Sequence, residues 1–156
     1  MLPAYLPTCL PVSMTTLLAA SAVAFLLSLF ARMAAETVLM ERVPIIGEFI
    51  GLSLVRNAGV AFGITFPPLL QVLLVAGALS LVLFLAWRSC RTQSHALGFG
   101  LIIGGALANI VDRLDDGLVT DFFQIGSFPT FNVADSCITV GVGVLLLWEV
   151  LKRSPV

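Results

Sequence analysis

Four long, nearly uninterrupted apolar stretches constrain the fold of this 156-residue chain more than any other feature. They cover residues 14–35, 68–87, 96–111 and 133–150. A hydrocarbon core of about 30 Å needs roughly 20 helical residues, and only a helix satisfies its own backbone hydrogen bonds in lipid. The third stretch is short for a full crossing, so we expect its end to lie near an interface. The sequence therefore predicts an all-α membrane protein with four transmembrane helices, formed as a single membrane domain over residues 1–156.

The amino-acid composition excludes a soluble globular domain. Hydrophobic residues make up 59% of the chain and charged residues 11%, whereas a soluble domain carries about 25% charged residues. The net charge is −1 and no basic stripe is present, so nucleic acid is not an expected partner. Cys9, Cys90 and Cys137 are far apart and odd in number, which indicates neither a disulfide framework nor a metal site. No Lys or Arg precedes the first apolar stretch, so we expect it to be retained rather than cleaved as a signal peptide.

The positively charged residues predict the orientation in the membrane. They gather after the second stretch and in the C-terminal tail, at Arg88, Arg91, Lys152 and Arg153. Because cytoplasmic loops are enriched in Lys and Arg, we expect both termini to be cytoplasmic. The loops over about 36–67 and 112–132 then lie on the extracytoplasmic side.

Both outer loops contain strand-like segments. Residues 48–55 place Ile50, Leu52 and Leu54 on one face, and residues 118–123 are rich in apolar and aromatic side chains. Alternation with a period of two is typical of a half-buried strand. We therefore expect a small β cradle on the extracytoplasmic side, resting on the helices.

Polar residues interrupt the apolar pattern in three short clusters. The first, with Asn57 and Gly59, follows the predicted strand. Its glycines permit a tight turn, and a plain polar turn is the commoner origin of such a pattern. The second ends the third stretch, where Asn109, Asp112 and Arg113 share one helical face. Asp112 and Arg113 are adjacent and opposite in charge, so we interpret them as a structural ion pair.

The third cluster begins the fourth stretch with Asn132 and Asp135. Asn is a preferred N-cap, and an acidic residue three positions later fits a capping box and the positive end of the helix dipole. A structural role at the helix start is compatible with catalysis, because one carboxylate oxygen stays available.

Asp121 is the other carboxyl group in an apolar setting, beside Phe122 and Phe123. A carboxylate there is costly unless it is partnered or functional. If Asp121 and Asp135 meet near the outer interface, desolvation and repulsion raise one pKa and leave one acid and one base. Such a pair is the apparatus of an aspartic protease.

The residues alone leave two other functions open. Intramembrane acids and asparagines also mark ion paths, so a small proton-coupled carrier or channel component is one alternative. The second and fourth stretches hold few polar residues, which disfavours it. A structural membrane subunit, in which the acids serve only as caps and ion pairs, is the other alternative.

Taken together, the polar motifs resemble those of the bacterial lipoprotein signal peptidases (signal peptidase II). The pattern Asn-x-Gly-x-Ala-Phe-Gly stands at residues 57–63, and Gly-Gly-Ala-x-x-Asn-x-x-Asp-Arg at residues 104–113. Gly-x-Val-x-Asp-Phe stands at residues 117–122, and Phe-Asn-x-Ala-Asp-Ser at residues 131–136. Each motif alone is weak, but four in order among four spans are specific. The resemblance covers roughly residues 15–150.

The resemblance implies a membrane aspartyl endopeptidase that removes the signal peptide from diacylglyceryl-modified prolipoproteins, cutting before the lipidated cysteine. It implies Asp121 and Asp135 as the catalytic pair. The residues that it implies as supporting the site or lying near the substrate are Asn57, Asn109, Asp112, Arg113 and Asn132, and Gly59, Phe62 and Arg32.

The resemblance also implies a setting and partners. The family has four helices with a small β cradle and needs no metal or organic cofactor. It implies a multi-pass monomer in the bacterial cytoplasmic (inner) membrane, surrounded by membrane lipid, with the active site near the extracytoplasmic face. Globomycin-type cyclic peptides are the expected inhibitors.

Two positions depart from the family pattern. The outer part of the first helix usually carries an Asp and, four residues later, a Lys, where this chain has Ser28 and Arg32. Arg32 keeps the positive charge, but Ser28 lacks the carboxylate. Ala108 replaces a glycine in the motif over residues 104–113. We expect these changes to alter the role of the first helix and not the pair Asp121 and Asp135.

Overall fold

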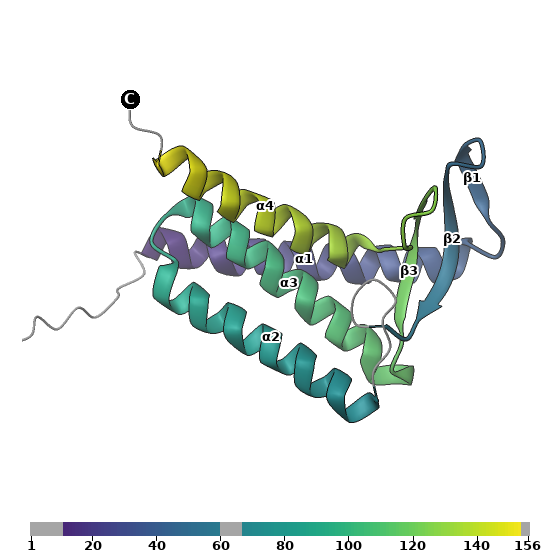
Figure 1. Cartoon of the computed structure of the whole chain (residues 1–156), viewed down its shortest axis with the longest axis horizontal. Coiled ribbons are helices and arrows are strands. Elements are labelled where there is room, and N and C mark those ends of the chain that lie inside the picture. Colours follow the sequence, from purple (N-terminus) through teal and green to yellow (C-terminus); the bar gives the residue numbers. More distant parts are fainter. Residues whose placement is uncertain (1–10, 60–66, 154–156) are drawn as a thin grey trace, which may run out of the picture.

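The computed structural model describes residues 11–59 and 67–153, which form four helices and a small sheet. The order is α1 (Pro11–Val38), β1 (Val43–Ile46), β2 (Ile50–Asn57), α2 (Pro68–Ser89), α3 (Gln93–Asp116), β3 (Val119–Ile125) and α4 (Val133–Arg153). All four helices are long and apolar enough to cross a membrane. The sheet lies at one end of the helices (Figure 1). The predicted fold class is therefore confirmed.

Helix α3 is the central helix, and half of its spanning segment is buried, compared with 6–11% in the other three. Glycines allow this close packing, as small residues do between membrane helices. A Cβ on Gly104 would collide with the backbone oxygen of Ser21 in α1. A Cβ on Gly105 would lie 2.5 Å from the backbone oxygen of Ala134 in α4. Helices α1 and α4 therefore pack closely on α3, whereas α2 contacts it over a smaller area.

The third helix is longer than the predicted 96–111, because polar residues continue it at both ends. The side chain of Thr92 caps its start by accepting a hydrogen bond from the backbone N–H of His95 at 3.2 Å. It continues to Asp116 and stops at Gly117, whose φ of 79° is the left-handed conformation that commonly ends helices. The expectation of a short third span is thus wrong. The other helices differ from the predicted ranges by at most three residues at each end.

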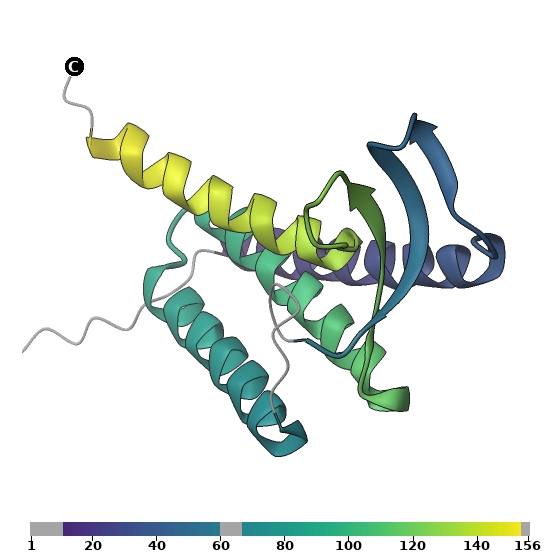
Figure 2. The same cartoon turned by 45° about the vertical axis from the view of Figure 1, so that its right-hand side comes forward.

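The three strands form an antiparallel sheet in the order β1-β2-β3. Strands β2 and β3 lie within two residues of the predicted strands, and Val55 is paired with Asp121 between them. Strand β1 was not predicted, because its four residues are all exposed and show no alternation. The β1–β2 hairpin projects to one side of the end of α1 (Figure 2). Arg42 stabilises it by donating hydrogen bonds to Glu48 Oε2 at 2.7 Å and to Gln124 Oε1 in β3 at 2.8 Å.

Candidate active site

Asp121 lies in the middle of β3 and is only 1% exposed. Each of its carboxylate oxygens accepts a hydrogen bond from an asparagine side chain. Asn57, at the end of β2, donates from Nδ2 to Oδ2 at 2.7 Å. Asn132, just before α4, donates from Nδ2 to Oδ1 at 2.9 Å. Three separate elements therefore surround this one buried carboxyl group.

Asp135 lies in the first turn of α4 and is partly exposed. Its Oδ1 accepts a hydrogen bond from Asn109 Nδ2 of α3 at 2.8 Å. Its Oδ2 accepts from the backbone N–H of Asn132 at 3.3 Å, and its own N–H donates to Asn132 Oδ1 at 2.9 Å. This reciprocal pair is the predicted capping box.

Asn132 links the two carboxyl groups. Its side-chain amide donates to Asp121, and its backbone N–H donates to Asp135. The same Nδ2 lies 3.1 Å from Asn109 Oδ1, so the asparagine that holds Asp135 also contacts the one that holds Asp121. The structure thus brings together the two aspartates from β3 and α4, as the sequence led us to expect.

The surroundings of Asp121 favour a protonated carboxyl group. The pKa of Asp121 is raised to about 6, mainly by burial and also by the negative charge of Asp135. The hydrogen bonds from Asn57 and Asn132 and the charge of Arg113 lower this pKa and only partly offset the burial. A buried Asp121 with a raised pKa beside the more exposed Asp135 is an arrangement suited to an acid and a base.

The predicted ion pair between Asp112 and Arg113 is wrong. Asp112 lies 3.0 Å from Arg32 Nε of α1 and accepts the backbone N–H of Thr120 at 2.7 Å. Arg113 instead donates to the backbone oxygens of Asn109 at 3.1 Å and Gly59 at 2.7 Å. Adjacent residues on a helix do not face each other, so the two side chains reach different partners.

Arg32 is shared by three acidic residues, because it also lies 3.2 Å from Glu36 and 3.1 Å from Asp115. Asp115 and Asp116 are exposed and belong to the last turn of α3.

Sequence reasoning missed a group of polar residues next to Asp121. Thr120 is 1% exposed, and its Oγ1 accepts a hydrogen bond from Arg56 at 2.8 Å. Arg56 is also paired with Glu36 at 3.0 Å and lies 3.6 Å from Asp116. Thr120 precedes Asp121, so these contacts fix the strand that carries it. The only signal for this group in the sequence is a threonine next to the aspartate. It does not indicate which residues contact the threonine.

Ser28 donates to the backbone oxygen of Ala24 at 2.7 Å and has no role in the ion pairs. It lines a small polar cavity together with Arg32, Asn109, Asp112 and others. About 10 Å³ is open to the centre of a water molecule, which is close to the space that one water needs. A small cavity therefore lies beside Ser28, where the family pattern has a carboxylate. Asp112 supplies the negative charge beside Arg32.

The remaining site residues are placed as follows. Gly59 is buried, and its backbone N–H donates to Asn57 Oδ1 at 2.7 Å. Phe62 lies outside the described residues. Within residues 11–59 and 67–153, no group of three or more His, Cys, Asp or Glu side chains is arranged to hold a metal ion.

A family model described as signal peptidase (SPase) II matches residues 19–151. A lipoprotein signal peptidase of Chlorobium luteolum is 36% identical over 70% of this chain and 74% of its own length. One of Chlorobium phaeobacteroides is 34% identical over 82% of this chain and 91% of its own length. One of Dehalococcoides mccartyi is 41% identical over 62% of this chain and 64% of its own length.

Solved structures support the fold. A bacterial membrane enzyme solved by the in meso method at 2.3 Å resolution superposes with a TM-score of 0.80 and 23% identity, covering 90% of this chain and 91% of that one. A second, at 1.9 Å resolution, gives a TM-score of 0.72 and 24% identity, covering 87% and 94%.

Proposed function

The chain belongs to the signal peptidase II family of membrane aspartic proteases, and from this premise we propose that Asp121 and Asp135 are its catalytic pair. The observation that carries the proposal is the linkage of the two carboxyl groups through Asn132. Paired carboxyl groups in unequal surroundings divide into an acid and a base.

The chemistry follows from these roles. Asp135 takes a proton from a water molecule as the water oxygen bonds to the scissile carbonyl carbon, and Asp121 donates its proton to the carbonyl oxygen. The tetrahedral intermediate then breaks its carbon–nitrogen bond. Asp135 passes its proton to the leaving amine, and the hydroxyl group of the intermediate returns a proton to Asp121. Both carboxyl groups regain their starting states, and no group beyond water is consumed.

The other residues hold this pair in place. Asn57, Asn109 and Asn132 donate to the carboxylates. Arg113 and Gly59 connect α3 to the end of β2. Arg32 and Asp112 lie further from the pair and fix Thr120. We assign Phe62 near the substrate from its motif alone.

The substrates that we propose are diacylglyceryl-modified prolipoproteins, cut before the lipidated cysteine so that the signal peptide is released. Support comes from the similarity to lipoprotein signal peptidases, with identities up to 41%, and from the position of the pair at the sheet end of the spanning helices. The substrate's own membrane helix would approach through the bilayer, and water would arrive from the adjoining interface. We further propose that the protein acts as a monomer without a cofactor and is inhibited by globomycin-type peptides.

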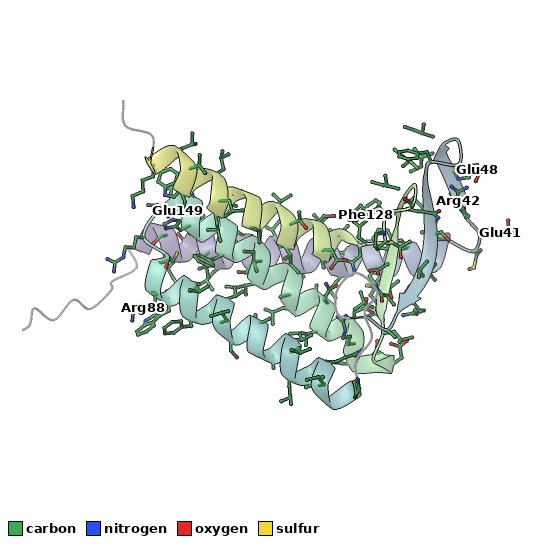
Figure 3. All side chains as sticks on the ribbon, viewed as in Figure 1. Glu41, Arg42, Glu48, Arg88, Phe128 and Glu149 are labelled. Atoms are coloured by element: carbon green, nitrogen blue, oxygen red, sulfur yellow. The ribbon has the colours of Figure 1, made fainter. Side chains whose placement is uncertain are left out.

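The proposed location is the cytoplasmic (inner) membrane, with both termini cytoplasmic and the site near the extracytoplasmic face. Arg88 and Glu149 lie at the end of the bundle opposite the hairpin that carries Arg42 and Glu48 (Figure 3). Arg91 also lies at the former end, in the short turn between α2 and α3. The enrichment of cytoplasmic loops in Lys and Arg supports this orientation.

A proton-coupled carrier is not favoured. Its polar residues would be spread through the membrane depth, whereas the hydrogen-bonded polar side chains of the site gather at the sheet end of the helices.

The function is tested with purified protein and a diacylglyceryl-modified precursor, beside the same precursor without lipid. Mass spectrometry should show one cut before the lipidated cysteine, only in the lipidated precursor, and globomycin should suppress it. Equal cleavage of the two precursors, or a cut elsewhere, would contradict the proposed substrate.

A further inference from the structure

An apolar groove separates α2 from the sheet-side end of α3. Its walls are formed mainly by Val72, Ala76, Leu79 and Leu83 of α2 and by Ile110 and Leu114 of α3. The two helices meet near the Arg88 end and diverge toward the sheet (Figure 2). The groove has a volume of about 710 Å³, within the roughly 300–1,000 Å³ of sites that bury a small ligand.

The dimensions of the groove indicate which kind of molecule fits into it. Its lining runs along α2 from Gln71 to Leu83, which is about 18 Å at the helical rise per residue. One leaflet of the hydrocarbon core is about 15 Å deep, so a single lipid chain matches this length. A transmembrane helix needs about 30 Å and a diameter of about 10–12 Å, which is far more than the groove offers.

The sheet-side end of the groove is formed by residues that are hydrogen-bonded to the candidate active site. Arg113 and Ala58 line its sheet-side end. Arg113 bonds the backbone oxygen of Gly59, and the N–H of Gly59 bonds Asn57, which in turn bonds Asp121. In the proposed substrate the lipid is attached to the residue after the scissile bond. An acyl chain lying in the groove would therefore place the scissile bond near the sheet-side end, close to the catalytic pair.

One donor at this end lacks an acceptor. The Nε of Arg113 is buried and has no hydrogen-bond partner among the residues that the structure describes. An unsatisfied buried donor costs free energy, and the carbonyl oxygen of an ester is an acceptor that would satisfy it. Ester carbonyls are present in a diacylglyceryl group, at the polar end of each acyl chain.

We propose that the groove between α2 and α3 binds one acyl chain of the substrate's diacylglyceryl group, with the ester end near Arg113. The inference rests on the proposed function and assigns a binding site for the lipid part of the substrate. The groove then contributes to substrate binding and not to the chemical step, so its loss changes KM and leaves kcat unaltered.

The test compares two precursors, dibutyryl and dipalmitoyl, in mixed micelles at one ratio of lipid to protein. Ala76→Trp fills the groove. Ala78→Trp is the matched control, because Ala78 is an exposed residue of the same helix outside the groove. We expect wild type to have the lower KM for the dipalmitoyl precursor. Ala76→Trp should raise that KM about tenfold, since the deeper methylenes lose their apolar contacts. It should leave kcat and the dibutyryl KM unchanged, because the short chain ends before Ala76, and Ala78→Trp should behave as wild type.

Three results would overturn the inference: wild-type KM values independent of chain length, equal effects of the two variants, or an Ala76→Trp effect of equal size on both precursors. Equal effects of the two variants would indicate that bulk lipid occupies the groove. An Ala76→Trp effect of equal size on both precursors would indicate that another part of the substrate binds there. If Ala76→Trp is inactive toward both precursors, the smaller Ala76→Leu is judged by the same criterion. Failure of wild type to cleave either precursor would instead contradict the proposed function itself.

Discussion

At the scale of single residues, the site depends on the unequal surroundings of two carboxyl groups. Asp121 is buried within the sheet and receives two asparagine amides. Asp135 is partly exposed in the first turn of α4, where a negative charge interacts favourably with the helix dipole. The roles that we propose for two identical side chains are therefore distinguished by position alone.

The pH dependence of cleavage should report the pKa of Asp121. Because the acid must hold its proton, kcat/KM should fall as pH rises through about 6. Asn57 stabilises the charged carboxylate and so lowers this pKa. Asn57→Ala should raise the pKa and move the alkaline limb to higher pH by about 1 unit. A pH–rate profile of both proteins measures the shift, and an alkaline limb that stays or moves to lower pH would contradict the assignment.

Arg32 offers a comparison between a buried and an exposed ion-pair partner. The side chain of Asp112 is 5% exposed and that of Asp115 is 72% exposed, yet both contact Arg32. Asp112→Ala breaks a buried ion pair and leaves the N–H of Thr120 without this acceptor. It should lower the free energy of unfolding by about 3–5 kcal/mol. Asp115→Ala should lower the free energy of unfolding by only about 0–1 kcal/mol. Thermal unfolding in one detergent compares the two, and equal losses would contradict the structural role of Asp112.

At the scale of elements, the contact between α1 and α3 depends on Gly104. A methyl group there would press on the backbone of Ser21 and on Ala24, so Gly104→Ala should lower the free energy of unfolding by about 1–3 kcal/mol. Gly77 of α2 is the matched control, because nothing lies within 4 Å of a Cβ at that position. Gly77→Ala should be neutral or slightly stabilising. A larger loss for Gly77→Ala than for Gly104→Ala would contradict the packing of these helices.

The elements also show what sequence can predict. The helices and two strands were predictable, because lipid requires long apolar helices, β2 packs Leu52 and Leu54 against the core, and β3 is largely buried. Strand β1 was not, because its pairing with β2 depends on a turn at Gly47 and on Arg42 bonds to distant residues. The capping box was predictable because it is local. The partners of Asp112 and Thr120 were not, because Arg32 and Arg56 reach them across the fold.

At the scale of the whole molecule, the proposed orientation places the two ends of the bundle in different compartments. We expect Glu48→Cys in the hairpin to react with a membrane-impermeant thiol reagent in intact cells, in a chain whose own cysteines are replaced. Arg91→Cys, in the turn between α2 and α3, should react only after the membrane is opened. The reverse pattern would contradict the orientation and place the site on the cytoplasmic face.

The catalytic pair is tested most directly by the cleavage rate of a diacylglyceryl-modified precursor with purified Asp121→Asn and Asp135→Asn proteins. Asp115→Asn is the control, because Asp115 is an exposed aspartate at the same end of the helices. Both pair variants should insert and unfold as wild type does but lose about 10²–10⁴-fold in rate, while Asp115→Asn stays near the wild-type rate. A rate close to wild type in either Asp121→Asn or Asp135→Asn would contradict the assignment.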